Sequence, residues 1–137
     1  MKHFSLLVVA LLLFAACSAE QAPLVANDVV ITRPPPGMQM SAGYLTLSNN
    51  TAATITIDRV ASPEFASVAM HESVLEDGIS RMYPLDTVAI PAGESVHFKP
   101  GGKHLMLMRP TADAGSTTLE FYSGDALLLT VDATMSD

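Results

Sequence analysis

The chain of 137 residues contains one cysteine, Cys17, and therefore cannot form an intrachain disulfide bond. A metal site elsewhere in the chain has no thiolate ligand, which excludes a blue-copper electron carrier because such centres need a ligating cysteine. Basic residues are also scarce, since seven Lys and Arg stand against fourteen Asp and Glu, giving a formal net charge of −7. A chain this acidic is repelled by nucleic-acid phosphates, so we expect no nucleic-acid partner.

Catalytic motifs and long apolar runs are missing as well. The sequence has no G-x-S-x-G nucleophile elbow, and Gly101-Gly102 indicates a turn rather than a phosphate-binding loop, so we expect no enzyme. The one long apolar run, residues 4–14, is too short to span a bilayer. Such a run near the N-terminus is typical of the hydrophobic core of a signal peptide, which predicts that the chain is exported.

The residues after this run predict how the chain is processed. FAAC, at residues 14–17, resembles a lipobox, which would make Cys17 the lipidated first residue of an envelope lipoprotein facing the periplasm. The lipid would then be the only attachment to the membrane, and Ser18 predicts sorting to the outer membrane. Phe14 stands where such motifs usually have Leu, so a plain secretory cut after Ala19 is the alternative. That cut would give a soluble periplasmic protein.

We predict three segments: a lipoprotein-type signal peptide over residues 1–16, a tether over 17–25 and a single domain over 26–135. The domain sequence is a succession of short β-forming runs separated by Gly, Pro and Asn. Polar and apolar residues alternate clearly in LTLS, at residues 45–48. No long amphipathic helix is apparent. This pattern predicts an all-β fold, an antiparallel sandwich or barrel without internal repeats.

Two histidines and two methionines carry most information about function. Ten residues separate His71 from Met82, twenty-one separate Met82 from His104, and one separates His104 from Met106. Imidazole and thioether groups are soft, uncharged donors. Such a set suits Cu(I), whereas Mg and Ca prefer oxygen and structural zinc usually has thiolates.

Local geometry would bring some of these side chains together. Asp77-Gly78 predicts a two-residue hairpin turn. That turn would set Ser73 opposite Met82 and His71 one diagonal step away, on the same face of the hairpin.

Three further methionines are candidate auxiliary residues. His104, Met106 and Met108 are two residues apart in a predicted strand and therefore project from the same face. Met108 is expected to pack in the core or beside the ligands. Met38 and Met40 form a Met-x-Met pair in a loop after three prolines, which could shield or hand over copper if it lies beside the site. Ordinary loop packing is the alternative for this pair.

The spacing His-x10-Met-x21-His-x-Met resembles that of the PCu(A)C periplasmic copper chaperones. The resemblance continues through ITRPPPG, AGYLTLSN, MHE, IPAGESV and FKPGGKHLMLM, in the same order, over residues 26–133. It implies a cupredoxin-like (immunoglobulin-like) β-sandwich and a single Cu(I) held by His71, Met82, His104 and Met106. It also implies delivery of copper, chiefly to the dinuclear centre in subunit II of cytochrome c oxidase, or exchange with another copper chaperone. Periplasmic copper storage or detoxification by the same ligands is the alternative.

Overall fold

The computed structural model describes residues 20–111 and 115–137, so the predicted signal peptide and Cys17 lie outside the described residues. This part of the chain contains eleven strands and no helix, and so no helix long and apolar enough to cross a membrane. The strands are β1 Leu24–Thr32, β2 Met40–Asn49, β3 Ile55–Ile57, β4 Arg59–Ala61, β5 Phe65–Glu76, β6 Ile79–Leu85, β7 Val88–Ile90, β8 Ser95–Phe98, β9 Lys103–Pro110, β10 Ser116–Ser123 and β11 Ala126–Ser136.

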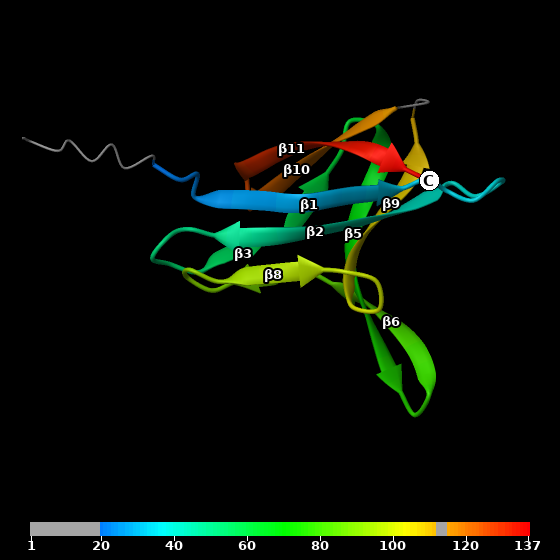
Figure 1. The fold of residues 1–137 in the computed structure, drawn as a ribbon, viewed down its shortest axis with the longest axis horizontal. Coiled ribbons are helices and arrows are strands. Elements are labelled where there is room, and N and C mark those ends of the chain that lie inside the picture. The colour runs from blue at the N-terminus through cyan, green and yellow to red at the C-terminus, as the bar shows by residue number, and fades with distance from the viewer. Residues whose placement is uncertain (1–19, 112–114) are drawn as a thin grey trace, which may run out of the picture.

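Nine of these strands form one sheet in the order β4-β10-β11-β1-β2-β8-β9-β5-β6, and β3 pairs separately with β7. The pairs are antiparallel except β1–β11 and β8–β9, which are short and parallel. Figure 1 shows β1, β2 and β11 running across the view, with β5 and β9 crossing behind them. The sheet thus bends over itself and encloses a core, which confirms the predicted all-β fold.

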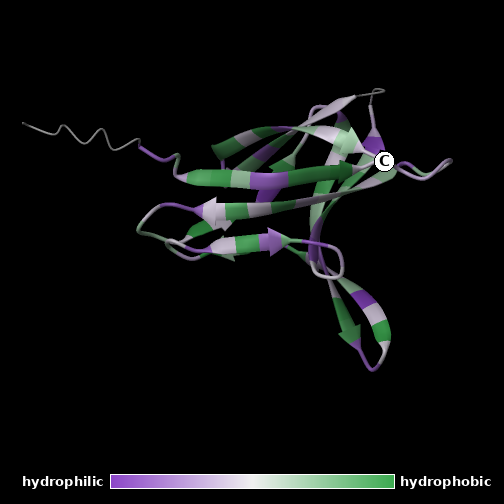
Figure 2. Ribbon diagram, viewed as in Figure 1, coloured by the Kyte–Doolittle hydropathy of each residue, from purple (hydrophilic) through white to green (hydrophobic). Residues whose placement is uncertain are grey.

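Polar and apolar residues alternate along the strands, which appears as stripes in Figure 2, and the apolar ones build the core. In β9, Leu105 and Leu107 are fully buried, while Met106 between them faces outward. All buried apolar side chains of the described residues lie between Leu24 and Ala133. A chain that starts at Gln21 therefore contains the whole core and is expected to fold by itself.

The folded region extends slightly beyond the segment boundaries drawn from the sequence. β1 begins at Leu24, which is buried, and so takes in two residues of the predicted tether. The carbonyl of Pro23 accepts a hydrogen bond from the N–H of Asn50 at 2.9 Å. At the other end, β11 continues to Ser136. These additional residues pair with strands in the body of the sheet. Composition alone does not predict such pairings.

The contact between β2 and β9 requires a residue without a side chain. β2 pairs with β8 along residues 45–48 and with β9 along residues 40–43, where Gly43 lies opposite Leu105. A Cβ atom on Gly43 would stand 3.1 Å from Cβ of Leu105 and 3.2 Å from Cδ1 of Ile31. These distances are shorter than ordinary van der Waals contacts. The absence of a side chain at Gly43 therefore allows β2 and β9 to approach each other.

Gly43→Ala is therefore expected to lower the free energy of unfolding by about 1–3 kcal/mol, because overpacking a filled core forces its neighbours to move. Gly115→Ala is the matched control, because nothing lies within 4 Å of a Cβ at that position. Urea denaturation of both variants measures the difference. Equal stability of the two variants would contradict the packing argument.

Candidate metal centre

The β5–β6 hairpin carries Met82 on an arm that protrudes from the body of the molecule (Figure 1). Its turn residues Asp77 and Gly78 both have positive φ, at 51° and 76°, as a two-residue hairpin turn requires. The register places Ser73 opposite Met82, so the predicted turn and its register are confirmed. Met82 is 50 % exposed, which leaves its thioether accessible from solvent.

Strand β9 supplies the next candidate ligands. His104 and Met106 project from the face opposite the buried Leu105 and Leu107. Because β9 pairs with β5, His71 stands directly opposite His104. The two imidazole rings are stacked, with centroids 6.0 Å apart and planes inclined by 20°. Two histidines separated by thirty-two residues of chain are thus brought together by a single strand pairing.

A tight turn before β9 orients the His104 ring. The N–H of Gly102 donates to the carbonyl of Lys99 at 3.0 Å, and Gly101 has a φ of +79°. Pro100 followed by a glycine with positive φ is the pattern of a type II turn. The carbonyl of Gly102 then accepts two hydrogen bonds, from the N–H of Ser73 and from Nδ1 of His104, both at 3.0 Å.

This contact determines which nitrogen of His104 is free to bind a metal. A carbonyl oxygen only accepts hydrogen bonds, so the proton of neutral His104 must lie on Nδ1 and the lone pair on Nε2. Nε2 lies 3.1 Å from Sδ of Met82, which also carries lone pairs. Two lone pairs that meet at this distance repel unless a proton or a cation lies between them.

The separation of Nε2 and Sδ also fits a metal ion. Tetrahedral bonds of about 2.0 Å to nitrogen and 2.3 Å to sulfur, such as zinc makes, place two ligand atoms about 3.5 Å apart. A small outward shift of the exposed Met82 side chain would reach that separation. The pair is therefore close to the geometry that a soft ion with these ligands needs.

His71 has an unsatisfied nitrogen beside this pair. Its Nδ1 is buried and has no hydrogen-bond partner within residues 20–111 and 115–137. Burial lowers the pKa of His71 from its usual value of 6.5, and the charge of His104 lowers this pKa further. A neutral imidazole with an unpaired nitrogen is suited to accept a metal. In this structure, however, the side chain of His71 does not line the cleft formed by the other three candidates.

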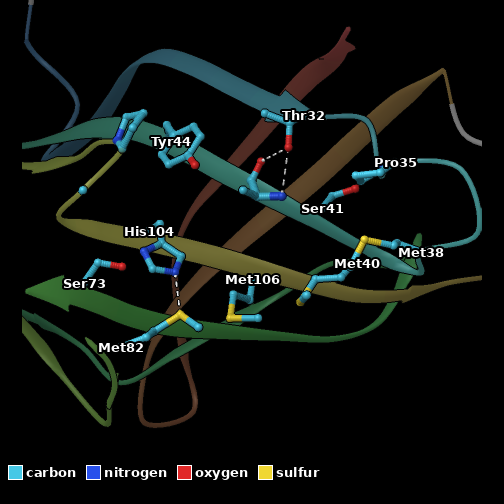
Figure 3. Close-up of a pocket in the computed structure, with 13 residues that line it drawn as sticks. Thr32, Pro35, Met38, Met40, Ser41, Tyr44, Ser73, Met82, His104 and Met106 are labelled. Atoms are coloured by element: carbon cyan, nitrogen blue, oxygen red, sulfur yellow. Dashed lines mark hydrogen bonds between the residues drawn. The ribbon is translucent and has the colours of Figure 1, made fainter. Parts of the chain in front are cut away.

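An open cleft of about 390 Å³ brings Met82, His104 and Met106 together (Figure 3). Met38 and Met40 line the same cleft, so the loop after the prolines does lie beside the candidate site. Met108 is on the same face of β9 but does not line the cleft.

The sequence reasoning missed some of the contributors to this site. Tyr44 and Thr32 also line the cleft. The largest omission is the carbonyl of Gly102, because a backbone group leaves no signature in the residue type.

Two charged neighbours of the candidate histidines project away from the ligand face. Glu72 and Lys103 pair at 3.0 Å, and both alternate with His71 and His104 along their strands, so they project from the other face. Within the described residues, no cluster of three or more His, Cys, Asp or Glu side chains could hold a metal. The donors that do converge are imidazoles and thioethers, which are neutral and soft.

The family can be assigned by comparison with known proteins. A family model described as "Putative lipoprotein LpqE-like" matches residues 24–134. The chain belongs to the LpqE-like family. Among curated relatives, "Putative lipoprotein Lxx21020" of Leifsonia xyli subsp. xyli is 33 % identical over 94 residues, which cover 64 % of this chain and 57 % of the relative.

A second curated relative of this LpqE-like protein is the protein RP573 of Rickettsia prowazekii. It is 30 % identical over 74 residues, which cover 53 % of this chain and 41 % of RP573. The chain thus spans about half the length of the curated relatives that it matches.

Solved structures share the fold of this LpqE-like chain. The copper-bound PCuAC domain of PmoF2 has a TM-score of 0.67 at 19 % identity, covering 82 % of this chain and 92 % of that domain. Cu(I)-DR1885 of Deinococcus radiodurans has a TM-score of 0.61 at 25 % identity, covering 88 % of this chain and 82 % of DR1885. The predicted cupredoxin-like fold and the resemblance to PCu(A)C proteins are confirmed.

The lowered pKa of His71 predicts a pH-dependent stability of the metal-free LpqE-like domain. Below pH 6.5 the unfolded chain protonates His71, while the folded protein keeps it neutral until the pH reaches its lower folded-state pKa. The unfolded state thus binds more protons in this window, so the free energy of unfolding should fall as pH decreases. Urea unfolding between pH 7.5 and 5 measures this dependence.

His71→Leu should reduce this loss of stability at low pH. The control is His97→Leu, because His97 is exposed on β8, where its Nδ1 lies 3.0 Å from the hydroxyl oxygen of Thr46. If both variants keep the pH dependence of the wild type, burial of His71 is not its cause.

Proposed function

We propose that this LpqE-like protein is an exported copper chaperone that binds one Cu(I) through His71, Met82, His104 and Met106. The observation that carries the proposal is the Nε2 lone pair of His104, which the Gly102 carbonyl leaves free and which faces the Met82 sulfur at 3.1 Å. Met106 lines the same cleft, and His71 has an unpaired nitrogen beside the His104 ring. The fold shared with copper-bound PCuAC structures supports the same reading.

Chemistry explains why such a donor set suits copper that is carried and then released. Cu(I) is a soft d10 ion without a strong geometric preference, and thioethers discriminate against harder ions. All four donors are neutral when bound, so the complex keeps a single positive charge and no anionic ligand retains the ion. Thioethers also cannot be consumed as disulfides in an oxidising compartment, although they can be oxidised to sulfoxides.

The exposure of the candidate ligands suggests how transfer begins. Met82 is half exposed on a protruding hairpin, whereas His104 and Met106 are partly buried on β9. A donor atom of a partner protein would therefore replace Met82 first, while the ligands on β9 still hold the ion. An open cleft of this kind favours a carrier over a storage protein, which would enclose its copper.

The candidate acceptors are the dinuclear copper centre of cytochrome c oxidase and another copper chaperone. We also propose that the protein resides in the cell envelope, attached by lipid at Cys17 through the tether. The family description and the name of the relative from Leifsonia support this location. Release into the periplasm after a plain secretory cut is the alternative.

Loss of one thioether should weaken binding without unfolding the protein. Met106→Leu conserves volume, so the free energy of unfolding without metal should change by less than about 1.5 kcal/mol. Cu(I) affinity, measured by competition with a chelator, should fall at least about tenfold, because even outer-shell changes have effects of that size. X-ray absorption of the wild type should show both sulfur and nitrogen ligands.

The control is Met135→Leu, because Met135 packs against the core from β11. It should leave Cu(I) affinity unchanged. A first shell of nitrogen and oxygen alone, or an affinity that Met106→Leu does not alter, would disprove the assignment.

Direct transfer distinguishes a chaperone from a storage protein. The Cu(I)-loaded domain is mixed with increasing amounts of the metal-free copper domain of cytochrome c oxidase subunit II. Ligand exchange predicts that the transfer rate rises with acceptor concentration. A rate that is independent of acceptor would mean that copper first dissociates into solution, as expected for storage.

A further inference from the structure

Two exposed methionines stand at the end of the cleft away from the arm. A turn over residues 35–38 places Met38, with its N–H donating to the carbonyl of Pro35 at 2.9 Å and Gly37 at a φ of +82°. Met40 follows at the start of β2. Met38 is 53 % exposed and Met40 36 %, in contrast to Met70, which is 5 % exposed in the core. Packing in the core therefore does not explain why positions 38 and 40 are occupied by methionine.

Strand pairing holds this segment against β9. The N–H of Arg109 donates to the carbonyl of Gln39 at 2.8 Å. In the register of β2 and β9, Met40 lies directly opposite Met108, and Ala42 lies opposite Met106. Residues directly opposite in an antiparallel pair have Cβ atoms about 4.5–5.5 Å apart and project from the same face.

A row of thioethers results along one face of the molecule. Figure 3 shows Met82, Met106, Met40 and Met38 following one another along the cleft. Met108 adds a fifth thioether on the same face, across the strand pair from Met40. The row runs from the tip of the candidate copper site to the loop after the prolines.

We propose that Met38, Met40 and Met108 form a second Cu(I) position made of thioethers alone, beside the site of the proposed function, on which this inference rests. Three neutral sulfur donors are soft enough to select Cu(I) over harder ions. Without imidazole the position binds more weakly than the first. This second position holds a Cu(I) ion transiently, and the ion then passes to Met106 and on to the histidine-containing site.

Methionine methyl groups report on this position directly. The chain from Gln21 onward contains seven methionines and no cysteine, so no thiol competes for the metal. This chain, with ¹³C-labelled methionine methyls, is titrated with Ag(I), which replaces Cu(I) without redox chemistry. The first equivalent should shift the methyl signals of Met82 and Met106. The second should shift those of Met38, Met40 and Met108.

Substitution tests the assignment. The double variant Met38→Leu, Met40→Leu should lose the second phase and keep the first. Met135→Leu, which removes a methionine that packs on the core, should keep both phases. The proposal is overturned if the Met38 and Met40 signals do not move beyond the first equivalent. It is equally overturned if the double variant weakens the first phase as much as Met106→Leu does, because both methionines would then serve the first site.

The same silver titration gives a different result if the proposed function, rather than the second position, is wrong. If Met82 and Met106 never respond to silver, the site between them does not exist as proposed. A response confined to Met38, Met40 and Met108 would then show a thioether position that stands without it.

Discussion

The candidate site depends on one backbone oxygen, the carbonyl of Gly102. It accepts the N–H of Ser73 and the Nδ1 proton of His104, both at 3.0 Å. The first bond ties the base of the β5–β6 arm to the turn before β9, and Ser73 is the residue opposite Met82. The second bond fixes the tautomer that leaves Nε2 of His104 free. A single acceptor thus positions both atoms of the closest donor pair.

Strand alternation separates the residues that stabilise the protein from those that would bind metal. In β9 the odd-numbered Leu105 and Leu107 fill the core, while His104 and Met106 face the cleft. The same separation holds in β5, where Met70 is buried and His71 faces His104. A change to an outward-facing side chain such as Met106 would therefore leave the core packing intact, whereas an added methyl group at Gly43 would press on Leu105 and Ile31.

Local features of the site were predictable from the sequence, and its long-range features were not. The turn at Asp77 and Gly78 has a strong residue signature, and its register follows from counting outward. The projection of His104 and Met106 from one face follows from the period of two. The pairing of β5 with β9, and the change of partner of β2 from β8 to β9, join segments far apart in the chain. No local pattern specifies these pairings, and only the family resemblance implied that the ligands converge.

In the proposed copper site, the position of Met82 would reconcile tight binding with release. β6 is the edge strand of the sheet, and Pro84, which cannot donate a backbone hydrogen bond, is accommodated at such an edge. The arm therefore lies outside the core, so the proposed replacement of the Met82 thioether by a donor atom of a partner protein would disturb few packed atoms. The imidazole and thioether on β9 are held by the body of the sheet and the Gly102 carbonyl. A site with ligands on both a rigid strand and an exposed hairpin can keep its ion until a partner supplies a replacement donor.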